Sequence, residues 1–175
     1  MVKYEAYPIE KGGGNPEKIT VIAESAGALL SVYALASTKS DTIREALSCP
    51  PVSISVDMLA CFSGMFYTTE RDLIGLVYPR NIYGERFKDR EFMEYMNPEN
   101  TEVMDNLPHM LLTSSDADFL KHYTLRYEKA LRRAGHSCEL IYYNAGNKEL
   151  THAFPALKPH LPESGEILKR IVEKI

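Results

Sequence analysis

An apolar, β-branched segment that passes directly into a helix-patterned segment restricts the fold of this chain more than any other feature. Residues 18–23 read Lys-Ile-Thr-Val-Ile-Ala, a nearly continuous apolar run that is typical of a strand buried on both faces of a parallel sheet. From Ala26 the apolar residues recur at helical spacing, at Leu29, Leu30, Tyr33, Leu35 and Ala36. The pattern predicts a strand, a sharp turn and a helix.

The same alternation continues along the chain. Three further strands are predicted, over residues 52–62, 109–114 and 137–143. A helix is predicted over 120–134, with Gly135 at its C-terminal end, and Ser164 is a candidate cap for a final helix. Strands that alternate with helices indicate an α/β fold, with a mostly parallel sheet covered by helices on both faces. The functional groups of such sheets lie on loops at the carboxyl ends of the strands.

Residues 65–106 interrupt this alternation. They are rich in aromatic residues and methionines, and short helical pieces are expected at 70–77 and 89–96. This composition is typical of a cap or lid, whose aromatic side chains form either its own core or the wall of an acyl-binding site. The chain of 175 residues has no internal repeat, so we expect one domain, residues 1–175, that carries this insertion.

Composition and charge exclude several classes of protein. The formal net charge is -4 and there is no long basic run, which argues against nucleic acid as a partner. Residues 1–8 lack the apolar core of a signal peptide, and no segment is long and apolar enough to span a membrane, so a cytoplasmic protein is expected. The cysteines are odd in number and lack metal-ligand spacing, so we expect reduced core residues at Cys49, Cys61 and Cys138.

The turn between the first strand and the first helix contains the candidate nucleophile. Residues 23–27 read Ala-Glu-Ser-Ala-Gly, and such a tight turn requires small residues two before and two after the serine, here Ala23 and Gly27. Ser25 would then lie at the helix N-terminus, where the Ala26 N–H and the helix dipole can stabilise an oxyanion. The alternative is that Ser25 is an ordinary helix N-cap.

A nucleophilic serine needs a base and an acid, and candidates follow the third and fourth strands. Asp116 and Asp118 come after the third strand, and His152 comes after the fourth. The order Ser, Asp, His, with each residue on a loop after a strand, is the order in α/β-hydrolases. The other histidines lack such a setting and are expected at surface or packing positions, with His160 as a weak alternative base: His109, His122, His136 and His160.

Three motifs resemble the carboxylesterase and hormone-sensitive-lipase-like branch of the α/β-hydrolases. These are Gly-Gly-Asn-Pro at 13–16, ahead of the elbow strand, Asp-Phe-Leu at 118–120 and His-Ala-Phe at 152–154. The last two are similar to the branch motifs Asp-Pro-Leu and His-Gly-Phe. The resemblance implies a triad of Ser25, Asp118 and His152, favours Asp118 over Asp116 through the Asp-x-Leu context, and requires no metal or organic cofactor.

The sequence also departs from this branch. Ala23, Phe119 and Ala153 stand where the branch has glycine, proline and glycine. The resemblance begins just before the elbow strand, whereas relatives have earlier strands and a His-Gly-Gly-Gly oxyanion loop. The glycines at 12–14 match the pre-elbow loop, so we do not expect them to replace that oxyanion loop or to bind phosphate. We therefore expect a partial α/β-hydrolase fold whose elbow strand is covered by self-association or by a separate N-terminal piece.

These residues predict a serine ester hydrolase. His152 would accept the proton of Ser25, Asp118 would orient the imidazole, and the Ala26 N–H would bind the oxyanion. The resemblance implies a small-molecule ester substrate with a short, possibly acetyl, acyl group. The non-enzymatic alternative is an incomplete hydrolase-like fragment that serves as a binding or assembly module. A peptidase or an acyltransferase would share the same residues.

Overall fold

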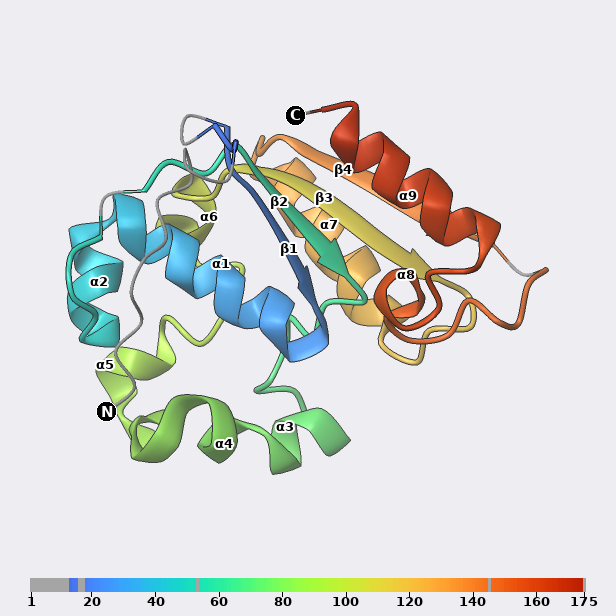
Figure 1. Ribbon diagram of the computed structural model, residues 1–175. Coiled ribbons are helices and arrows are strands. Elements are labelled where there is room, and N and C mark those ends of the chain that lie inside the picture. Colours follow the sequence, from blue (N-terminus) through green and yellow to red (C-terminus); the bar gives the residue numbers. More distant parts are fainter. Residues whose placement is uncertain (1–12, 16–17, 53, 145, 175) are drawn as a thin grey trace.

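A four-stranded parallel sheet forms the centre of the computed structural model, which describes residues 13–15, 18–52, 54–144 and 146–174. The strands are β1 (Thr20–Glu24), β2 (Met58–Phe62), β3 (His109–Ser115) and β4 (Cys138–Tyr143), in the order β1-β2-β3-β4. Every neighbouring pair is parallel, so each strand reaches the next through a crossover that contains helix (Figure 1). The predicted α/β class and parallel sheet are confirmed.

Helices cover both faces of the sheet (Figure 1). One face packs against α1 (Ser25–Lys39), α2 (Asp41–Leu47), α6 (Thr101–Asp105) and α7 (Lys121–Arg133). The other face packs against α8 (Phe154–Leu157) and α9 (Pro162–Val172). Alternate side chains of β2 point to opposite faces, so Leu59 and Cys61 enter the first core while Met58, Ala60 and Phe62 enter the second. Because both faces are covered, every residue of β2 is buried.

The segment between β2 and β3 forms a layer of short helices beside α1 and below the sheet in Figure 1. It contains α3 (Leu73–Val77), α4 (Pro79–Tyr83), the 3-10 helix η2 (Gly84–Lys88) and α5 (Arg90–Met93). Phe66 anchors the start of this segment on α7, with its ring centroid 4.4 Å from that of Tyr127. In contrast, α3 buries none of its residues.

The second strand is shorter than predicted. It begins at Met58 and not at residue 52, because β1 and β3 also begin at that level: Met58 is paired with Thr20 on one side and with His109 on the other. Residues before Met58 therefore have no neighbouring strand on either side to pair with in the sheet. Val52 and Ile54 are accordingly 54% and 41% exposed, although their β-branched side chains favour strands.

The last helix also begins differently from the prediction. It starts at Pro162. Proline suits the first helical position because the backbone N–H that it lacks would have no partner within the helix there. Leu161 precedes it as the N-cap without a side-chain hydrogen bond, so the prediction that Ser164 caps this helix is wrong. Ser164 is buried, and its hydroxyl donates instead to the carbonyl of Lys158 at 2.9 Å.

All three cysteines are free, but they do not share one environment. Cys61 is buried in β2, Cys138 is half-buried, and Cys49 is exposed. The expectation of a core position is therefore wrong for Cys49, which follows α2 at the surface.

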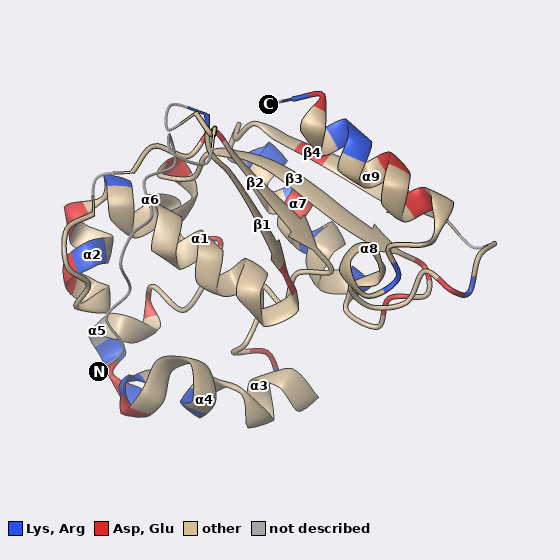
Figure 2. Ribbon diagram, viewed as in Figure 1, with Lys and Arg blue, Asp and Glu red and all other residues tan. Residues whose placement is uncertain are grey.

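Charged residues lie on the helices and loops, and the strands carry few of them (Figure 2). Both signs occur along α9, where Glu163, Glu166, Lys169 and Arg170 follow one another within three turns. Among the helices that the structure describes, none is long and apolar enough to cross a lipid bilayer.

Candidate active site

Ser25 lies at the sharp turn where β1 ends and α1 begins. Its backbone is left-handed, with φ at 50°, a conformation that residues other than glycine rarely adopt. The Ser25 carbonyl accepts a hydrogen bond from the Met65 N–H at 2.9 Å, which ties the turn to the segment after β2. The N-cap of α1 is Glu24, and no side chain caps the helix, so the interpretation of Ser25 as an N-cap is wrong.

Gly27, two residues after Ser25, has room for one more carbon atom. A Cβ atom added to Gly27 would meet no atom within 4 Å, because this position in the first turn of α1 faces open space. Alanine therefore fits at Gly27, and the expectation that larger side chains do not fit stays a prediction. Ala23, in contrast, packs against the core cluster beneath α1.

The structure places Ser25, His152 and Asp118 in one hydrogen-bonded chain. The His152 Nε2 atom lies 2.9 Å from the Ser25 Oγ atom, and His152 Nδ1 lies 2.9 Å from Asp118 Oδ1. Since the carboxylate can only accept, Nδ1 carries the proton and Nε2 accepts from the serine hydroxyl. The three residues follow β1, β4 and β3, whose carboxyl ends meet at one edge of the sheet.

Asp118 is buried at 1% exposure and accepts several hydrogen bonds. Ser114 Oγ donates to its Oδ2 at 2.7 Å, and the Leu120 N–H donates to its Oδ1 at 2.9 Å. Burial opposes ionisation, but the bonds from His152, Ser114, Leu120 and Ser63 outweigh it and hold the pKa of Asp118 below its usual value. Asp118 is therefore a carboxylate at neutral pH, as an acid that orients a histidine must be.

Asp116 has a different environment. Its Oδ1 accepts from the Tyr142 hydroxyl at 2.7 Å and lies 3.5 Å from the Lys121 ammonium. Its side chain is 38% exposed, against 0% for Asp118. It is Asp118 that contacts the histidine next to Ser25.

The other histidines lie elsewhere. His109 and His136 lie at the opposite end of the sheet, where they hydrogen-bond Ser137 and the Pro108 carbonyl. His122 is exposed beside Tyr123, and His160, the alternative base, is exposed on the loop before α9. Of the five histidines, His152 is the one that contacts Ser25.

The expected oxyanion donor is the N–H of Ala26, the second residue of α1. The first N–H groups of a helix have no partner within the helix, so they can receive an anion. Gly13 and Gly14 are exposed, whereas Gly12 and Lys11, and Pro16 of the family motif, lie outside the described residues.

Two serines near Asp118 were not identified from the sequence. Ser114 ends β3 together with Ser115, and Ser63 follows β2, between Ser25 and Asp118 along the carboxyl edge. Their position directly after predicted strands is a signal that could have found them. Their contacts with one carboxylate could not have been inferred from spacing alone.

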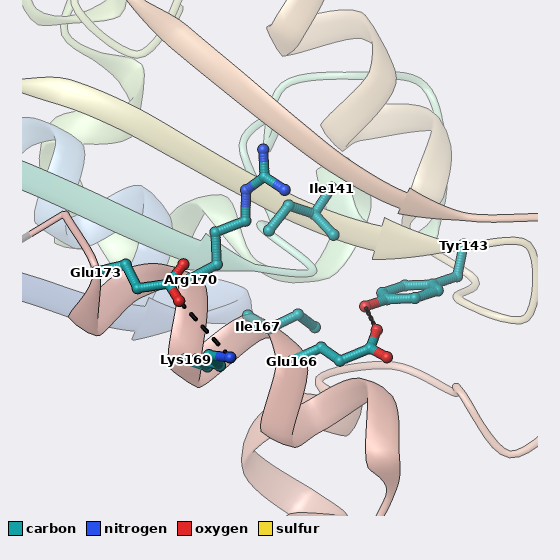
Figure 3. Close-up of a pocket in the computed structure, with 7 residues that line it drawn as sticks. All are labelled: Ile141, Tyr143, Glu166, Ile167, Lys169, Arg170 and Glu173. Atoms are coloured by element: carbon teal, nitrogen blue, oxygen red, sulfur yellow. Dashed lines mark hydrogen bonds and ion pairs between the residues drawn. The ribbon is translucent and has the colours of Figure 1, made fainter.

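A cavity of about 300 Å³ lies between β4 and α9, away from these residues (Figure 3). Figure 3 shows two interactions among its side chains: Glu166 accepts from the Tyr143 hydroxyl, and Lys169 contacts Glu173. The other cation, Arg170, pairs with Glu139 at 2.5 Å. None of Ser25, Asp118 and His152 lines it. This cavity therefore does not serve the chemistry that those three residues could perform.

A family model described as the alpha/beta hydrolase fold matches residues 2–155. A search of curated protein sequences gave no match. The structure resembles an inhibited esterase B from Lactobacillus rhamnosis, with a TM-score of 0.81, 15% identity, and coverage of 95% of this chain and 55% of that chain.

Two further structures share the fold. An esterase from the bacterial hormone-sensitive lipase family matches with a TM-score of 0.55 and 19% identity, over 94% of this chain and 55% of that chain. The acylaminoacyl peptidase of Pyrococcus horikoshii matches with a TM-score of 0.58 and 16% identity, over 86% of this chain and 22% of that chain. This chain thus spans about half the length of the esterase structures.

Proposed function

Because the chain belongs to the alpha/beta hydrolase fold family, whose model matches residues 2–155, we propose that it is a serine hydrolase of carboxylic esters. The observation that carries the proposal is the hydrogen-bonded chain from Ser25 through His152 to Asp118. Esterases and a hormone-sensitive lipase family member among the similar structures support the same reaction class.

The proposed reaction has two halves. Ser25 Oγ attacks the ester carbonyl carbon while His152 Nε2 accepts its proton, and the Asp118 carboxylate stabilises the imidazolium that forms. The Ala26 N–H stabilises the oxyanion, and the imidazolium then gives its proton to the departing alcohol oxygen. In the second half, water attacks the acyl-enzyme with His152 again as base, which releases the acid and restores Ser25.

We place the substrates among small esters with short acyl groups, acetyl to butyryl. The similar esterase B structure is described with a C4-C4 tributyrin phosphonate, which makes butyryl esters a suitable first substrate. Three free cysteines, one of them exposed at Cys49, support a reducing, cytoplasmic setting for the reaction.

The direct test is hydrolysis of p-nitrophenyl acetate and p-nitrophenyl butyrate. Ser25→Ala and His152→Ala should each reduce kcat by about 10⁴-fold or more, since either removes the proton-transfer pair. The chain offers two matched controls, because His160→Ala and Asp116→Asn change the same residue types at exposed positions. Both controls should hydrolyse the esters at the wild-type rate.

The alternative function, a binding or assembly module, is favoured by one observation. β1 lies at the edge of the described sheet, and its Ile22 is 49% exposed. Association with a second copy or with an N-terminal piece would cover this strand and could supply a second oxyanion donor. Sedimentation velocity tests this association: a monomer would argue against coverage of β1 by a second copy.

A fluorophosphonate probe separates the two functions without a choice of substrate. In a hydrolase, Ser25 Oγ should displace fluoride from phosphorus and the protein should gain the mass of the phosphonyl group, whereas Ser25→Ala should gain none. Unlabelled wild-type protein that also leaves both esters intact would reject the hydrolase and favour the binding module.

A further inference from the structure

Strained backbone is concentrated around the proposed nucleophile and base. Four residues other than glycine have positive φ among the described residues: Ser25 at 50°, Ser48 at 54°, Ser63 at 50° and Ala153 at 53°. Ser25 is the proposed nucleophile, and Ala153 directly follows His152. Strained conformations of this kind persist where the surrounding structure enforces them, often at functional sites. Neither Ser63 nor Ala153 takes part in the proposed reaction, and of these two Ser63 has the polar side chain.

Ser63 occupies a central place at the carboxyl edge of the sheet. It follows β2, which lies between β1 and β3 (Figure 1), so it lies between the loops that carry Ser25 and Asp118. It is 1% exposed, and its N–H donates to the Thr113 carbonyl at 2.8 Å. That bond continues the β2–β3 pairing one residue past the end of β2 and fixes the position of Ser63.

The Ser63 hydroxyl connects the acid to the loop that carries the base. It accepts a hydrogen bond from the Ala153 N–H at 2.8 Å, and it also hydrogen-bonds the Asp118 carboxylate. A hydroxyl has one hydrogen, which it donates to the carboxylate, while a lone pair remains for the N–H. One buried side chain thus joins Asp118 to the residue next to His152.

A serine is an unfavourable choice for this backbone. Glycine adopts positive φ without steric cost, and asparagine and aspartate tolerate it better than serine does. Neither glycine nor alanine could supply a hydroxyl that bonds Asp118 and the Ala153 N–H at once. The hydroxyl is therefore the feature that a serine adds at this strained position.

We propose that Ser63 is a positioning residue that fixes the distance between the Asp118 carboxylate and the His152 imidazole. This inference rests on the proposed function and extends it to a fourth side chain. Removal of the hydroxyl would leave Asp118 with donors from His152, Ser114 and Leu120, so the carboxylate itself would stay in place. The Ala153 N–H, in a residue only 2% exposed, would lose its partner, and the His152 loop would shift to satisfy it.

The test compares Ser63→Ala and Ser63→Gly with the matched control Ser48→Gly. Ser48 has nearly the same φ but is exposed at the end of α2, so its replacement relieves the same backbone conformation away from the site. Ser63→Gly also relieves the strained backbone, which keeps a folded variant available if Ser63→Ala does not fold. Thermal unfolding of each variant records stability separately from activity.

Two readouts decide the role of Ser63. In the wild type, the proton between His152 Nδ1 and Asp118 should give a downfield proton NMR signal that is absent from His152→Ala. Both Ser63 variants should shift or lose this signal, and kcat for p-nitrophenyl butyrate should fall by about 10- to 100-fold with KM nearly unchanged, since a small misplacement of a catalytic group is costly. Ser48→Gly should match the wild type in both readouts.

An unchanged signal and an unchanged kcat in Ser63→Gly would overturn the proposal, because the hydroxyl would then have no effect on the pair. A wild-type protein without esterase activity would reject the proposed function instead. The NMR comparison would still decide whether Ser63 holds Asp118 and His152 together.

Discussion

The Phe119 ring packs against the His152 imidazole, with the two ring centroids 4.5 Å apart and the planes inclined by 41°. Phe119 directly follows Asp118, so one short segment supplies both the partner of Nδ1 and a wall against the ring face. The phenylalanine is nonetheless 65% exposed. In the proposed reaction, this ring would cover one face of the imidazole and leave its other side free to contact an apolar part of the ester.

Replacement of Phe119 should affect catalysis more than folding. We expect Phe119→Ala to lower kcat/KM for p-nitrophenyl butyrate by about 3- to 10-fold, the equivalent of one aromatic contact. The effect should be smaller for the acetate, which has less apolar surface to bury. Leu157→Ala on α8 is the matched control, because Leu157 is equally exposed at 66%. Equal losses on both esters would show that the ring acts only on the imidazole.

Asp118 should make stability depend on pH in acid. Its pKa is lowered in the folded protein, so the stabilisation is present above the unfolded-state pKa of about 4 and is lost as pH falls through the folded-state pKa. Urea unfolding should therefore show that the wild type loses more stability than Asp118→Asn between pH 5 and pH 2. A difference in unfolding free energy between the two proteins that stays constant across this range would contradict the lowered pKa of Asp118.

Much of this architecture follows from residue patterns. Buried strands appear as continuous apolar runs, and the turn at Ser25 is marked by the change from strand to helical spacing. The short helices α2, α6 and α8 were not predicted, because segments of four to seven residues contain too few helical turns for the spacing of apolar residues to identify a helix. The start of β2 depends on where its neighbours begin, a tertiary fact that its own residues do not encode.

The candidate site shows the same limit. Ser25, Asp118 and His152 could be named because each has a local motif and follows a strand. Ser63 has no such motif: its importance lies in a positive φ and in contacts with residues 55 and 90 positions away in the sequence. Contacts of that range are set by the packing of β2 between its neighbours.

Gly75 should be required for the position of α3. A Cβ atom at Gly75 would lie 1.8 Å from the Glu70 carbonyl oxygen, and a backbone atom cannot move aside as a flexible side chain could. The Gly75 N–H also donates to Asp72 Oδ1 at 2.9 Å, which fixes the first turn of the helix. We expect Gly75→Ala to destabilise the protein by about 1–3 kcal/mol through overpacking. Limited proteolysis should cleave residues 70–77 faster than in the wild type, and equal cleavage rates would contradict this expectation.

Gly27 should tolerate what Gly75 does not. An added Cβ at Gly27 meets no atom within 4 Å, and its φ is not positive, so alanine fits the existing backbone. Because glycine within a helix costs about 0.5–1 kcal/mol relative to alanine, Gly27→Ala should raise the free energy of unfolding by a similar amount. Ester hydrolysis should stay at the wild-type rate, since the Ser25–His152 contact lies outside the change. A Gly27→Ala variant that unfolds earlier or loses activity would show that the turn does demand a glycine two residues after the serine.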